Sequence, residues 1–180
     1  EATVTSTLTF TPLNWDTPQT VTVTGVDDDT IDGTVSSTIT INVIDAISDD
    51  NFDPVSSQTV TATTTDNDTA GFTIVESGGS TSVSESGTTD TFTVVLDAQP
   101  TSDVVLTVTS NDTGETAVNT PLTFTSANWD TPQTVTVTGV DDNIIDGTIS
   151  STITVSVNDG NSDNDFDAVA DQTVTATTTD

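Results

Sequence analysis

The sequence predicts an all-β chain made of tandem antiparallel β-sandwich modules with about seven strands each. Apolar residues alternate with Thr or Ser along most of the chain, which is typical of strands with one face buried and one face in water. Gly, Asp, Asn, Pro and Ser cluster between these stretches, as they do in turns. A long stretch also recurs at a fixed offset of 114 residues. Helical periodicity is found nowhere in the sequence.

Seven alternating stretches are expected to form strands within one period of the repeat. β-branched Thr suits the solvent face of a pleated sheet, so Thr is expected to point outward and the apolar residues inward. Seven short antiparallel strands within 114 residues match a sandwich of immunoglobulin-like size. The expected strands are 72–75, 91–96, 104–109, 122–125, 134–138, 151–157 and 173–177.

The repeat divides the chain into one partial and one complete module. Residues 1–66 align with 115–180 without a gap, and 46 of these 66 positions are identical. We therefore predict that 1–66 is the C-terminal part of one module and that 67–180 is one complete module. The first part contains only the last four strands of a module, so it cannot bury its sheet face alone. The 180 residues are expected to be a window of a longer array.

Every charged side chain of this protein is acidic. It has no Lys, Arg, His or Cys and 29 acidic residues, which gives a formal net charge of −29. No side-chain ion pair or disulfide can form. Such a field repels nucleic acid and anionic membrane surfaces, so neither is expected as a partner. No run of about 18 apolar residues is present, so direct membrane insertion is not expected either.

The same composition argues against an enzyme. Without His, Cys, Lys or Arg, the roles of general base and nucleophile fall to carboxylates alone. A glycosidase could use two carboxylates about 5–10 Å apart, but it usually also needs an aromatic platform, and the chain has two Trp and no Tyr. Trp15 and Trp129 share one repeat position and are expected to pack at the edge of a sandwich. We predict no catalytic activity.

The acidic residues are concentrated between the expected strands. They lie in the equivalent loops 26–33 and 140–147, in 66–68, in 111–115, and in the equivalent segments 45–53 and 159–167. In a seven-stranded sandwich, the loops that follow strands three, five and seven can meet at one pole. Hard divalent cations bind six to eight oxygens at about 2.3–2.6 Å, mostly from carboxylates and carbonyls. The spacing favours a metal site, and the alternative is a solvated acidic surface suited to saline water.

Several short motifs give the chain a resemblance to a known family. They are Phe72–Glu76, Val83-Ser-Glu85-Ser-Gly87, 122–125 with Asn128-Trp129, Val140-Asp-Asp142 and Asp66-Asn-Asp68-Thr-Ala-Gly71. In their order and spacing they resemble a Calx-β domain, the calcium-binding sandwich of sodium–calcium exchangers, integrin β4 and many long bacterial surface proteins. The resemblance covers 67–180 and the matching part before it.

The resemblance implies calcium at one pole of each sandwich. In the complete module it places the ligands on Glu85, Asp112, Asp141, Asp142, the Ile144 carbonyl, Asp146 and Asp180. In the upstream part it places them on Asp27, Asp28, Asp32, Asp66 and Asp68. The family has one further acid, which is Val35 or Ile149 here, so fewer ions are expected at each junction.

These observations predict a structural role. We expect a calcium-stabilised repeat of a long extracellular protein on a bacterial cell surface, acting as a rod-like stalk or filament in adhesion, biofilm or matrix. Its expected partners are neighbouring repeats, with lateral or end-to-end self-assembly. The alternative is an adhesin module that binds a glycan or protein ligand in a calcium-dependent way.

Overall fold

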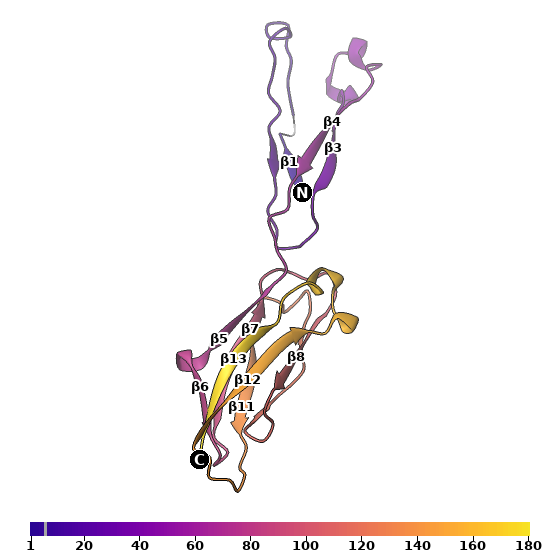
Figure 1. Ribbon diagram of the computed structural model, residues 1–180. Coiled ribbons are helices and arrows are strands. Elements are labelled where there is room, and N and C mark those ends of the chain that lie inside the picture. The colour runs from indigo at the N-terminus through magenta and orange to yellow at the C-terminus, as the bar shows by residue number, and fades with distance from the viewer. Residues whose placement is uncertain (6) are drawn as a thin grey trace. The chain divides into compact units, whose positions relative to one another are not determined.

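The computed structural model describes residues 1–5 and 7–180 (Figure 1). The chain forms two compact units. The first unit comprises 1–28 and 32–67, and the second comprises 29–31 and 68–180. Within the described residues, no helix is long and apolar enough to cross a membrane.

The second unit is a β-sandwich of two sheets (Figure 1). One sheet has five strands in the order β10-β8-β12-β13-β6, and the other has four in the order β5-β7-β11-β9. The strands are β5 (Phe72–Glu76), β6 (Thr81–Ser84), β7 (Thr89–Leu96), β8 (Val104–Ser110), β9 (Thr116–Val118), β10 (Leu122–Phe124), β11 (Gln133–Gly139), β12 (Thr148–Val157) and β13 (Gln172–Thr179). Three short 3-10 turns accompany them, η3 (Ser77–Gly79), η4 (Asp159–Asn161) and η5 (Asn164–Phe166).

The alternating pattern of the sequence determines which side chains enter the core. Along β7, Phe92, Val94 and Leu96 are buried, while Thr93 and Val95 between them are only partly buried. One apolar cluster is shared by both sheets and contains 17 buried residues. Trp129 packs against this cluster from its edge. The prediction of an all-β sandwich is confirmed.

All seven expected strands are present, and the structure adds β6 and β9. β6 has the sequence TSVS with one apolar residue, and β9 has the sequence TAV with its two apolar residues adjacent, so neither shows the alternation of apolar and polar residues. The register also differs from a purely antiparallel sandwich, because β6 pairs with β13 in parallel. This pairing places the segment after β6 beside the end of β13, where the Glu85 N–H donates to the Thr179 carbonyl (3.0 Å).

The first unit contains two separate two-stranded sheets. They are formed by β1 (Ala2–Val4) with β2 (Val23–Gly25), and by β3 (Val35–Ile41) with β4 (Gln58–Thr64), with the 3-10 turns η1 (Asp45–Ile47) and η2 (Asp50–Phe52) between β3 and β4. Each pair has the register of the strands 114 residues later. Ala2 pairs with Gly25 as Thr116 pairs with Gly139. The same local sequence therefore forms the same local pairing in both units.

The two units differ in burial even where their sequences are identical. Phe10 is 54% exposed, whereas its equivalent Phe124 is 0% exposed; Phe52 and Phe166 are 58% and 0% exposed. No described residue of the first unit is fully buried. Strand pairing within 1–66 thus forms without the sheet-on-sheet packing that buries the equivalent residues in the second unit.

Candidate metal centre

Three carboxylates from both sheets of the second unit meet at one end of the sandwich. Glu85 follows β6 of the five-stranded sheet, and Glu115 precedes β9 of the four-stranded sheet. Asp146 lies in the loop that connects β11 to β12. One carboxylate oxygen from each residue lies within 4.8 Å of the other two. This group is called the acid cluster below.

Two of these carboxylates are buried without full hydrogen bonding. Glu85 is 8% exposed and Glu115 is 5% exposed. Among the residues that the structure describes, Oε1 of Glu85 and Oε2 of Glu115 are buried and have no hydrogen-bond partner. Burying a charge without a partner is strongly unfavourable. The chain has no cationic side chain that could pair with these carboxylates. Their charge must therefore be neutralised by a bound cation or a proton.

Burial and neighbouring negative charge both raise the pKa of these glutamates. For Glu115, burial raises the pKa most, followed by the charges of Asp146, Asp112, Asp142 and Asp180. For Glu85, burial again comes first, followed by the charge of Asp180 and a hydrogen bond with it, and then by Asp142 and Asp146. Both carboxyl groups therefore hold their protons more strongly than usual unless a cation binds beside them.

The expected ligands of the complete module occupy three kinds of position. Glu85 and Asp146 belong to the acid cluster. Asp112, Asp142 and Asp180 act on Glu115 through their charge. Asp112 and Asp142 each accept a backbone N–H of their own loop, from Gly114 (3.1 Å) and Ile144 (2.6 Å). Asp180, which follows β13, accepts the Gly147 N–H (2.6 Å) of the loop between β11 and β12. Asp141 and the Ile144 carbonyl are not among the groups brought together, and their roles stay predictions.

Sequence reasoning missed Glu115 as a site residue and chose Asp112 from the same loop. The Glu115 side chain reaches the acid cluster, whereas Asp112 caps its own turn through Gly114. Two signals could have found it. Glutamate is rare in this chain, with four residues, and Glu115 has an identical equivalent in Glu1. The longer glutamate side chain also reaches farther than aspartate from the start of a strand.

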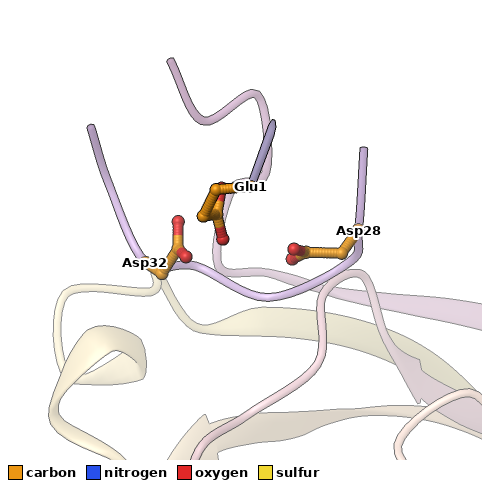
Figure 2. A group of neighbouring side chains, drawn as sticks. All are labelled: Glu1, Asp28 and Asp32. Atoms are coloured by element: carbon orange, nitrogen blue, oxygen red, sulfur yellow. The ribbon is translucent and has the colours of Figure 1, made fainter. Parts of the chain in front are cut away.

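The first unit has an exposed cluster made of Glu1, Asp28 and Asp32, which is called the first-unit cluster below. Figure 2 shows the side chains of Asp28 and Asp32 pointing toward Glu1 from either side. Glu1, Asp28 and Asp32 are equivalent to Glu115, Asp142 and Asp146 in the repeat. A hydrogen bond with Asp32 is the main cause that raises the pKa of Glu1.

The backbone around the first-unit cluster is also arranged as in the second unit. The Val26 N–H donates to the Glu1 carbonyl (2.8 Å), as the Val140 N–H does to Glu115 (2.9 Å). The Asp66 carboxylate accepts the N–H groups of Asp32 (3.1 Å) and Gly33 (2.9 Å). Asp66 thus supports the loop from which Asp32 comes. Asp27 is not part of the first-unit cluster, and Asp68 belongs to the second unit; their expected roles stay predictions.

Asp163 is a buried carboxylate of a different kind, because its hydrogen bonds are satisfied. Its Oδ2 accepts the Thr101 N–H (2.7 Å), the Thr101 hydroxyl (2.7 Å) and the Ser102 N–H (2.8 Å). Burial raises its pKa, but these bonds outweigh burial and the pKa is lowered. Asp163 therefore holds the loop before β8 in place as an anion and needs no cation.

Replacing Asp163 with Ala should destabilise the second unit by about 1.5–3 kcal/mol, the usual range for losing hydrogen bonds to a charged group. Its equivalent Asp49 is exposed, and its carboxylate accepts hydrogen bonds from the Asn51 N–H and side-chain amide of the same turn. Asp49→Ala should therefore change the free energy of unfolding of the second unit by less than about 0.5 kcal/mol. Urea unfolding of both variants measures the difference, and equal losses would contradict it.

Comparisons with known proteins give structural neighbours only. No family model matches the chain, and no curated protein matches it. Among solved structures it is similar to the apo-form Calx CBD1 domain, with 14% identity, a TM-score of 0.40, and 61% of this chain and 98% of that chain covered. Domains 4 and 5 of the S-layer protein SbsC give 24% identity, a TM-score of 0.41 and coverage of 68% and 53%.

The E. coli chaperone DraB gives 8% identity, a TM-score of 0.44 and coverage of 61% and 56%. The chain thus spans about half the length of the SbsC and DraB structures (53% and 56%). The likeness to these structures is one of fold alone.

Proposed function

We propose that this chain is a calcium-stabilised structural module of an extracellular protein. The observation that carries the proposal is the pair of buried, unpartnered oxygens of Glu85 and Glu115 beside Asp146. In a chain without cationic side chains, a bound cation is the partner that lets these groups stay ionised at neutral pH.

The donor chemistry favours calcium over other metals. The chain offers only oxygen ligands, since it has no His and no Cys. Zinc and copper sites are built mainly from nitrogen and sulfur. Calcium accepts six to eight oxygens in flexible geometry, and the negative charges of Asp112, Asp142 and Asp180 around Glu115 add to the attraction. Magnesium demands near-ideal octahedral geometry and keeps several waters, which suits a cluster of protein carboxylates less well.

A cation in the acid cluster would join the two sheets at one end of the sandwich. Glu85 is attached to the five-stranded sheet and Glu115 to the four-stranded sheet. An ion bound only by the folded state stabilises that state by RT ln(1 + [L]/Kd), which is about 2.7 kcal/mol at a hundredfold excess over Kd. The module would then be rigid in calcium-rich surroundings and looser in their absence.

The wider role follows from repetition and charge. We propose a rod-like stalk or filament on the outside of a bacterial cell, in which neighbouring repeats are the partners and no reaction is catalysed. The identity of 46 of the 66 aligned positions of 1–66 and 115–180 supports this role, because a spacer reuses one surface along its length. A glycan array with calcium tests the alternative: binding to defined glycans would favour an adhesin module, and a spacer should bind none.

Calcium titration with single-residue variants tests the metal site itself. Glu85→Gln and Glu115→Gln should each weaken calcium binding at least tenfold, because each removes a charged ligand from the cluster. Glu76→Gln is the matched control, since Glu76 lies outside the cluster and its carboxylate accepts the Thr81 hydroxyl. Isothermal titration calorimetry in low-salt buffer gives the affinities. Equal affinity for all three variants and the unmodified chain would show that calcium binds elsewhere.

A further inference from the structure

The first unit has an exposed apolar face. In the second unit the equivalent face is covered, and the segment that covers it can be named. Of the 17 core residues of the second unit, 8 come from 68–114 and 9 from 115–180. Each of the nine has an apolar equivalent in the first unit, and none of these is fully buried. The nine equivalents are Leu8, Phe10, Val21, Val23, Ile39, Ile41, Phe52, Val60 and Ala62.

An open hollow in the first unit marks the position of one missing strand. It is lined by β1, β2 and β4, including Ala2, Val23, Gly25 and Ala62. In the second unit the equivalents of β2 and β4 are β11 and β13, and β6 lies against both of them. The hollow is therefore the place that β6 occupies in the complete sandwich.

A glycine in each unit supports this position. A Cβ atom at Gly139 would lie 2.0 Å from the Ser84 carbonyl oxygen, so β6 can only pack there because residue 139 has no side chain. Its equivalent Gly25 lines the hollow, and a Cβ atom at Gly25 would meet only the Thr64 Cγ2 atom, at 3.4 Å. The described residues of the first unit therefore leave room for a side chain at residue 25, whereas an incoming strand like β6 would not.

We propose that the first unit is the acceptor half of a sandwich, and that its occupant is a second copy of the half-module 68–114. The occupant's β6 would fill the hollow beside Gly25. The occupant's β7 and β8 would pair with β2 and β3, as β7 pairs with β11 and β8 with β12 in the second unit. Residues 68–114 of this chain already pack against 115–180. The occupant of the first unit is therefore an additional copy of this half-module.

The occupant also completes the first-unit cluster. In the second unit Glu85 comes from 68–114, whereas Glu115 and Asp146 come from 115–180. Docking would thus bring the occupant's glutamate against Glu1, Asp28 and Asp32 and bury Glu1, as Glu115 is buried. Because four carboxylates then meet, docking is expected to be stronger in calcium than in chelator. This calcium dependence rests on the proposed function, whereas the apolar docking does not.

An extended chain tests the proposal, with a second copy of residues 67–114 joined to Glu1 as Gly114 is joined to Glu115. Hydrogen exchange followed by mass spectrometry reports on β2 and β4, while β11 and β13 of the same molecule serve as internal reference. In calcium, exchange in β2 and β4 should slow at least tenfold relative to the unextended chain. Unchanged exchange in β2 and β4 would overturn the proposal.

Two variants of the extended chain make the test specific. Gly25→Ala should restore fast exchange in β2 and β4, yet leave exchange in the unextended chain and in β11 and β13 unchanged. Val83→Asp in the added copy alone should act in the same way. Slow exchange that persists in both variants would mean that the added segment covers another surface, which would overturn the proposed position of β6.

The calcium part is tested separately. Glu85→Gln in the added copy should keep the slow exchange and reduce its dependence on calcium. If docking occurs equally in calcium and in chelator, the shared cluster is refuted but the acceptor face stands. If the unextended chain fails to bind calcium in calorimetry, the proposed function of the second unit fails, independently of docking.

Discussion

Replacing Phe166 with Ala should lower the free energy of unfolding of the second unit by about 3–5 kcal/mol, the usual loss for removing a buried aromatic ring. Phe166 is 0% exposed and belongs to the core cluster shared by both sheets. The lost ring removes apolar burial and leaves a cavity that the surrounding strands cannot fill. Urea unfolding followed by Trp129 fluorescence measures the loss, since Trp129 packs against the same core.

The matched control is Phe52→Ala, because Phe52 is the repeat equivalent of Phe166 and is 58% exposed. It should change the stability of the second unit by less than about 0.5 kcal/mol, as exposed substitutions usually do. The pair separates sequence from environment, because the residue type and neighbouring sequence are alike and only the packing differs. Similar losses for the two variants would mean that the first unit is covered in solution.

Acid should change the stability of the second unit differently in chelator and in calcium. In chelator, the raised pKa values of Glu85 and Glu115 mean that the folded state binds more protons than the unfolded chain. This contribution to stability is fully present below the unfolded pKa of a glutamate, 4.5, and is lost as pH rises through the raised folded pKa values. Between pH 7 and about 5, acid should therefore raise the stability of the metal-free unit.

In calcium the same two carboxylates are held as anions, so protons compete with the ion. The stabilisation by calcium, about 2.7 kcal/mol at a hundredfold excess over Kd, should shrink as pH falls from 7 toward 5. The gap between the melting temperatures in calcium and in chelator should accordingly close with acid. Carboxylates with a lowered pKa, such as Asp163, contribute less to the stability of the fold as pH falls, in calcium and in chelator alike. The difference in melting temperature between the two solutions therefore reports on the acid cluster.

Sodium chloride of equal ionic strength is the control for general screening. A solvated acidic surface would be stabilised as much by sodium as by calcium, because only the screening of repulsion matters there. A calcium-specific gap at pH 7 that narrows toward pH 5 supports a bound ion. A gap of the same size at both pH values, or one reproduced by sodium, contradicts it.

The local structure could be predicted from the sequence because it depends on period and neighbours. Alternation of Thr with apolar residues predicted the strands β5, β7, β8 and β10 to β13, and the repeat predicted that equivalent strands would pair alike. The short strands β6 and β9 could not be predicted in this way. β6 contains a single apolar residue and the two apolar residues of β9 are adjacent, so neither strand shows the alternation.

The candidate site was predicted only in part, for a related reason. The resemblance placed ligands on Asp112 and Asp141 as well as on Glu85 and Asp146. The acid cluster joins Glu85 and Asp146 with Glu115, which was not predicted, and Glu85 and Glu115 are separated by 30 positions. Their proximity depends on how β6 and β9 are held at the same end of two different sheets.

The sequence by itself determined the all-β class, the 114-residue period and a chain without a single cationic side chain. Only the tertiary structure decided which copies of identical residues are buried, as Phe10 and Phe124 show. The physical reason is that strand pairing is set by near neighbours, whereas burial requires a second sheet to exclude water. The same packing turned Glu115 into a buried carboxylate and left its equivalent Glu1 exposed to solvent.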